Sequence, residues 1–149
     1  MPERIRAFCA RTGQPQPTDP GEVVRCILES LALKHAQTVE LLGAVTGTAP
    51  AEIHVVGGGA RNDLLCRWTA SAAGLPVVAG PVEATVVGNL LVQAIALGEL
   101  GSLAEARDVV RASFDLATYE PDDPPFWREA RERFDALTAG DGALAGVDR

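Results

Sequence analysis

Three consecutive glycines, Gly57 to Gly59, constrain the fold of this chain more than any other feature of its sequence. They follow a short apolar run, Ile53 to Val56, and precede a segment from Asn62 with the pattern of a helix. Each glycine costs backbone entropy. Three together therefore indicate either a tight turn or a place where a ligand approaches the backbone, and this stretch alone leaves both interpretations open.

Turn and cap residues divide the rest of the chain into elements. They predict helices over residues 2–10, 20–42, 62–73, 84–97, 103–112 and 124–137, and two short strands at 53–56 and within 75–81. We expect Asp19 to cap the second helix and Gly43 to end it. The segment "FDLATYEPDDPPF" is typical of a loop. The helix over 84–97 has almost no polar face, so we expect it at the centre of the core.

This inventory predicts an α/β fold that is mostly helical around one βαβ unit, residues 52–80. Two strands make a poor sheet by themselves, because a typical sheet has four to six. We therefore expect the remaining strands to belong to sequence outside this chain.

Length, charge and hydrophobicity limit the classes of partner and the location that we expect for this chain. The 149 residues suffice for one domain, and the net charge of −7 disfavours duplex nucleic acid and anionic membranes as partners. No apolar run approaches the roughly 20 residues that span a bilayer. The first residues, "MPERIRAFCARTG", have no hydrophobic segment typical of a signal peptide, so we expect a cytoplasmic location.

Cysteine and histidine are scarce. Three cysteines (Cys9, Cys26 and Cys66) and two histidines (His35 and His54) lie far apart in sequence, without a CxxC pair. We expect neither a zinc site nor a Cys–His nucleophile.

The glycine turn matches neither of two familiar phosphate-binding motifs. A Walker A loop needs a lysine after its glycines, and this segment has none. The dinucleotide fingerprint needs a third glycine at the position of Asn62. Glu83 lies beyond Pro81, past the strand end at which a ribose-binding acid belongs. Even so, glycine amides between a strand and a helix N-terminus favour an anion or nucleotide, and Asn62 could serve an adenine or ribose. The alternative is that the glycines only turn the chain and Asn62 only caps the helix.

The stretch "VVGGGARNDLLCRWTASAAGLPVVAGPVEATVVGNLLVQAIALGEL" resembles the C-terminal domain of the FGGY carbohydrate kinases, especially its rhamnulokinase group. The segments "ERIRAFCARTGQP", "CILESLALKH" and "SFDLATYEP" are similar as well, so the resemblance covers residues 1 to about 121. It implies part of an actin-like, ribonuclease-H-like ATPase lobe over residues 1–139, followed by a flexible tail at 140–149.

The resemblance also implies a site. Gly57, Gly58 and Gly59 would bring backbone against the α-phosphate and ribose of ATP or ADP. Ala60 would form part of the pocket wall, and Asn62 would lie beside the adenine.

A second family motif includes Glu83, Thr85 and Gly88. We interpret these residues as mainly structural, with Gly88 permitting close packing of its helix.

The family's sugar-binding lobe, its catalytic aspartate and its other phosphate segments have no counterpart in this sequence. We therefore expect a C-terminal nucleotide-binding fragment of a kinase that uses ATP and Mg²⁺ on a ketose such as L-rhamnulose, inactive by itself. Two alternatives remain: a Rossmann-like NAD-binding module, and a non-catalytic module that forms homo-oligomers through its apolar helix and sheet edge.

Overall fold

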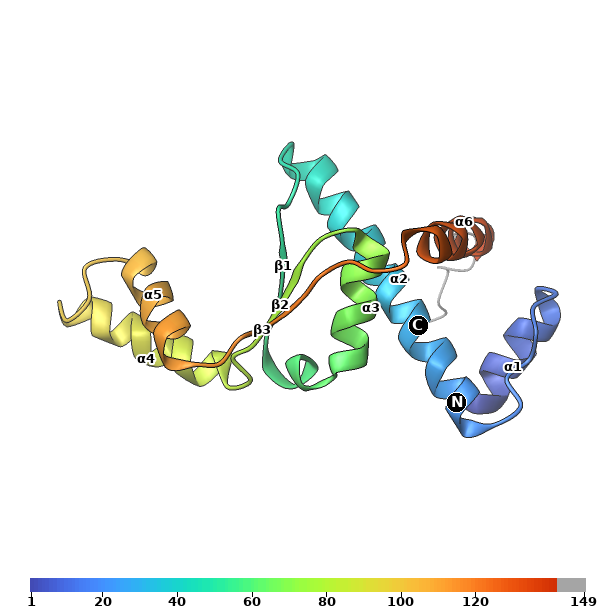
Figure 1. The fold of residues 1–149 in the computed structure, drawn as a ribbon, viewed down its shortest axis with the longest axis horizontal. Helices are drawn as coiled ribbons and strands as arrows, with labels where there is room; N and C mark the ends of the chain where they lie inside the picture. Colours follow the sequence, from blue (N-terminus) through green and yellow to red (C-terminus); the bar gives the residue numbers. More distant parts are fainter. Residues whose placement is uncertain (142–149) are drawn as a thin grey trace, which may run out of the picture.

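The computed structural model describes residues 1–141. Along this range the elements are α1 (Pro2–Arg11), α2 (Pro20–Thr46), β1 (Ile53–Val55), η1 (Gly57–Arg61), α3 (Asp63–Ala73), β2 (Val77–Ala79), α4 (Ala84–Ala96), α5 (Leu103–Ser113), β3 (Ala117–Tyr119) and α6 (Pro124–Asp141) (Figure 1). The flexible tail expected at 140–149 lies, beyond Asp141, outside the described residues.

The sheet has the order β1-β2-β3. β1 and β2 are parallel with Ile53 opposite Val77, which confirms the predicted βαβ unit, and β2 pairs antiparallel with β3, where Val77 faces Tyr119. β3 lies in the segment that we expected to be a loop, and that expectation was wrong. Only three residues pair, and their strand conformation comes from the neighbouring β2 rather than from a strong local pattern.

Helix α3 lies between the sheet and the long helix α2, and α6 packs against both α2 and α3. One core cluster joins α3 to the sheet and is built from Cys66, Ala70, Val77 and Ala79. The other joins α2, α3 and α6 around Ala32, Leu33 and Trp127, with Trp68 packed against it. These clusters fix the first turn of α3, which follows the glycine turn.

Helix α2 begins as predicted but ends later. Asp19 caps it by accepting a hydrogen bond from the Glu22 amide at 2.9 Å. Gly43 stays helical, and the helix continues to Thr46. The chain leaves the helix at Gly47, which adopts the left-handed conformation (φ 69°) of a typical C-terminal cap.

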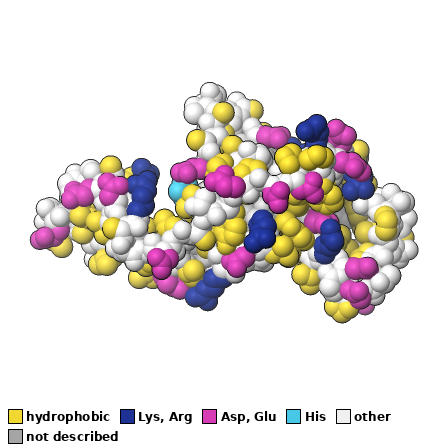
Figure 2. Space-filling model, in the orientation of Figure 1, with side chains coloured by type: hydrophobic (Ala, Val, Ile, Leu, Met, Phe, Trp, Pro, Cys, Tyr) yellow, Lys and Arg dark blue, Asp and Glu magenta, His cyan; other side chains and the backbone are white. Residues whose placement is uncertain are grey.

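Helix α4 is not central in the described structure, contrary to our expectation. It pairs with α5 in a hairpin at the left end of the molecule, away from α2, α3 and α6 (Figure 1). Val86, Leu90 and Leu97 are 67%, 66% and 79% exposed, and hydrophobic side chains lie on the surface of this hairpin (Figure 2). The apolar pattern is present, but α5 covers only part of it.

The exposed hairpin is part of an open shape. The accessible surface is 10094 Å², whereas a compact monomer of this 15.6 kDa mass would expose about 7,300 Å². The chain is therefore more open than a compact monomer of its mass.

Candidate functional site

The predicted strand–turn–helix is present. β1 ends at Val55, the three glycines form the first part of the 3₁₀ helix η1, and α3 begins at Asp63. Gly57 takes a φ of +75°, a left-handed conformation that favours glycine. Its amide donates to the Pro81 carbonyl at 3.2 Å, so the segment after β2 supports the turn.

Gly58 has open space above it. A Cβ atom built on Gly58 would meet no atom within 4 Å, whereas one on Gly59 would lie 3.5 Å from Val55 Cγ1. Gly58 is the second residue of η1, where the helix supplies no acceptor for an amide. An exposed amide beside open space at the entrance to a helix fits the phosphate or ribose of a nucleotide. The geometry leaves room for the close backbone approach that the three glycines predict.

Asn62 already has one structural task. Its Oδ1 accepts a hydrogen bond from the Leu65 amide at 3.0 Å and so caps α3. This is the capping role that the sequence left open. The side-chain Nδ2 has no hydrogen-bond partner among the described residues, and it remains able to donate to a ligand.

Ala60 faces the core rather than open space. Its half-buried side chain packs against the cluster of α3 and the sheet. Behind the same turn, the buried Cys66 thiol lies 3.8 Å from the Gly59 carbonyl. Burial raises the pKa of this thiol, with a smaller contribution from the nearby Asp63 carboxylate. Both side chains support the turn from the core side.

A tyrosine that sequence reasoning missed reaches the start of α3. The Tyr119 hydroxyl, on β3, donates a hydrogen bond of 2.8 Å to Asp63 Oδ1. This bond is the main cause that raises the pKa of Tyr119. No sequence signal predicts it, because the two residues are 56 positions apart and Tyr119 lay in an expected loop.

The segment that leads from β2 to the second family motif adjoins the glycine turn, through the hydrogen bond from Gly57 to Pro81. Gly80 takes a φ of +114°, and a Cβ there would come 3.1 Å from Leu116 Cδ2. Glu83 precedes α4 and its carbonyl accepts from the Val87 amide at 3.0 Å, without a side-chain cap. Gly88 does not permit close packing here, because a Cβ would meet nothing within 4 Å.

The described residues offer little else in the way of chemistry. Within 1–141 there is no group of three or more His, Cys, Asp or Glu side chains that could hold a metal ion. In the same range, no helix combines the length and apolar character that crossing a bilayer requires.

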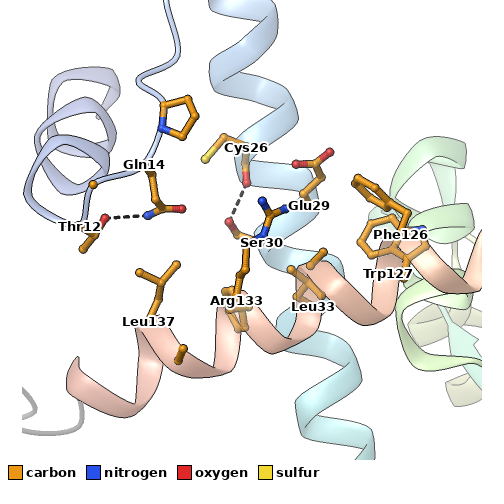
Figure 3. A pocket seen from close by; sticks show the side chains of 15 residues that line it. Thr12, Gln14, Cys26, Glu29, Ser30, Leu33, Phe126, Trp127, Arg133 and Leu137 are labelled. Atoms are coloured by element: carbon orange, nitrogen blue, oxygen red, sulfur yellow. Dashed lines mark hydrogen bonds between the residues drawn. The ribbon is translucent and has the colours of Figure 1, made fainter.

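A cavity of about 620 Å³ lies elsewhere, between the α1–α2 loop, α2 and α6 (Figure 3). None of its lining residues belongs to the glycine turn. Two hydrogen bonds lie within its lining: Gln14 Nε2 donates to Thr12 Oγ1 at 2.7 Å, and Ser30 Oγ donates to the Cys26 carbonyl at 2.7 Å. The charged side chains of Glu29 and Arg133 line it as well.

Comparisons with known proteins agree with the geometry. The C-terminal domain of the FGGY family of carbohydrate kinases matches residues 1–97. Rhamnulokinases of Bacteroides thetaiotaomicron, Enterobacter sp. (strain 638) and Klebsiella pneumoniae are 47%, 42% and 43% identical over 90%, 81% and 81% of this chain. The chain spans 28%, 25% and 25% of these relatives, respectively.

The crystal structure of xylulose kinase from Rhodospirillum rubrum shares the fold, with a TM-score of 0.68 and 26% identity. The similarity covers 89% of this chain and 27% of that one. The predicted fold class, a mostly helical part of an actin-like α/β lobe, is confirmed. The family match extends over well more than half of the sequence, and this chain therefore belongs to the FGGY family of carbohydrate kinases, in its C-terminal domain.

Proposed function

We propose that this chain is the nucleotide-binding part of an ATP-dependent sugar kinase that phosphorylates a ketose such as L-rhamnulose. The observation that carries the proposal is the open approach to Gly58, between the end of β1 and the start of α3. It occurs in a chain that is 42–47% identical to rhamnulokinases over most of its length.

Four residues would contact ATP or ADP, and a fifth would support them. Gly57, Gly58 and Gly59 bring the backbone against the α-phosphate and ribose, and the Gly58 amide is the donor. Asn62 offers Nδ2 to the adenine, since its Oδ1 caps α3. Ala60 supports the turn from the core.

The remaining parts of phosphoryl transfer belong elsewhere. Kinases position Mg²⁺, a base and the acceptor hydroxyl around the γ-phosphate, and residues 1–141 offer no acidic cluster for the ion. We infer that Mg²⁺ arrives on the nucleotide and that the sugar and the base are supplied by a second lobe. By itself the chain binds nucleotide without turnover. We place this function in the cytoplasm and assign it to residues 1–139.

A thermal-shift titration of the 149-residue chain with MgATP tests the proposal, because a ligand that binds the folded state raises the unfolding temperature. The variant Gly58→Asp places a carboxylate in open space without a steric clash, and we expect it to abolish the shift. Thr48→Asp adds the same charge at an exposed residue of the loop between α2 and β1 and should leave the shift unchanged. No response to MgATP in the wild type would contradict the proposal, and stabilisation by NADH alone would favour a dinucleotide site.

A further inference from the structure

Asp63 places a negative charge close to the proposed nucleotide site. It is the first residue of α3, directly after Asn62, and its side chain is exposed. A carboxylate in the first turn of a helix is favourable for the helix dipole. It is unfavourable for a phosphate that approaches the same helix end, because like charges repel.

The Tyr119 hydroxyl holds this carboxylate from the side of the sheet. It donates to Asp63 Oδ1 at 2.8 Å. The ring of Tyr119 packs against the core cluster that includes Cys66 and Val77, and its backbone pairs with Val77 across β2 and β3. The donor is therefore anchored in the sheet. A tyrosine hydroxyl is protonated at neutral pH, and the bond to Asp63 raises its pKa further.

We propose that Tyr119 is a positioning residue for nucleotide binding: it draws the Asp63 carboxylate toward β3 and so keeps this charge away from phosphates bound at Gly58. The inference rests on the proposed function, because it requires a nucleotide at the glycine turn. Without the hydroxyl, the Asp63 side chain is free to rotate toward the turn. The effect grows with the charge of the ligand, so it applies to ADP and ATP and not to adenosine.

The variants Tyr119→Phe, Asp63→Asn and the double variant separate this role from a structural one. Calorimetric titration at low ionic strength measures the affinity for ADP, and an NMR titration measures the affinity for adenosine. We expect Tyr119→Phe to weaken ADP binding about two- to fivefold, because the freed carboxylate repels the phosphates more strongly wherever it comes closer to them, and to leave adenosine binding unchanged. Asp63→Asn should bind ADP more tightly than the wild type, and the double variant should have the same affinity for ADP as Asp63→Asn. Added salt near 0.5 M should remove the differences, because it screens the charge.

Each outcome is informative. A wild-type chain that binds neither ADP nor adenosine overturns the proposed function, and this inference with it. If the wild type binds ADP and Tyr119→Phe binds it with the same affinity, the inference is wrong but the proposed function is not. Tyr119 would act only through the fold if Tyr119→Phe lost affinity for ADP and adenosine equally, or if adding Asp63→Asn did not restore its affinity for ADP.

Discussion

The Gly57 amide donates a hydrogen bond of 3.2 Å to the Pro81 carbonyl. This bond joins the glycine turn after β1 to the segment after β2, which leads into the second family motif. A side chain at Gly57 would also approach the Val82 carbonyl, 3.9 Å from a Cβ. The position of the turn thus depends on the path of the chain from Gly80 to Val82 and not only on the glycines themselves.

Gly80→Ala should therefore destabilise the protein, whereas Gly58→Ala should not. Gly80 takes a φ of +114° and a Cβ would come 3.1 Å from Leu116 Cδ2. We expect a loss of about 1–3 kcal/mol in the free energy of unfolding, the usual cost of a strained backbone conformation. Gly58 has neither restriction, and its variant should stay within about 0.5 kcal/mol of the wild type. Urea unfolding of both variants checks this, and equal stabilities would contradict it.

Sequence patterns predicted the elements whose signals are local. The apolar run before Gly57, the helix after Asn62 and the cap at Asp19 each depend on a few adjacent residues, and the structure has all three. The strand β3 has no such signal, because Ala117 to Tyr119 become a strand through pairing with β2. The sequence pointed to Gly43 as the helix end, and only the backbone conformation places that end at Gly47.

The candidate site could be predicted only in part. The three glycines and Asn62 stand out in the sequence, but the support of the turn by Pro81 and the bond between Asp63 and Tyr119 join distant segments. No periodicity encodes such contacts. The exposure of α4 was missed for a related reason, since a pattern shows that a face is apolar without showing what covers it.

Trp127→Ala should be among the most destabilising substitutions. Trp127 is 5% exposed and belongs to the cluster that joins α6 to α2 and α3. Its ring also meets Phe126 edge-on, with 5.3 Å between centroids. Truncating a large buried aromatic side chain costs about 3–5 kcal/mol. Leu97→Ala, at a residue that is 79% exposed, is the control and should change little. Similar losses for both variants in urea unfolding would argue against a core position for Trp127.

Asp135 should contribute stability that disappears in acid. Partial burial raises the pKa of this carboxyl, but hydrogen bonds from Gln37 Nε2 (2.6 Å) and Arg131 Nε (2.9 Å) outweigh it and lower the pKa below its usual 3.8. A lowered folded-state pKa means that the stability is present above pH 4 and is lost as the pH falls through the folded value. The side chain is 49% exposed, so the contribution should stay below about 1 kcal/mol.

The variant Asp135→Asn measures this contribution. Its difference from the wild type in free energy of unfolding should be constant from pH 7 to about pH 5 and should close below about pH 4. Asp108→Asn is the control, because Asp108 contacts only an exposed arginine of its own helix, Arg111. A gap that widens in acid would contradict the assignment.

The exposed face of α4 should make the chain self-associate. Val86 and Leu90 lie one helical turn apart and are 67% and 66% exposed. A stable interface buries about 600–1,000 Å² on each partner. The surface that this chain exposes in excess of a compact monomer is larger than that area. We expect light scattering to give a mass above 15.6 kDa at micromolar concentrations.

The double variant Val86→Lys/Leu90→Lys should return the monomer mass without unfolding the chain, because neither side chain is buried. Ala104→Lys/Ala112→Lys adds the same charge at exposed positions of α5 and should leave the association unchanged; a wild type that scatters as a monomer would contradict the role of α4.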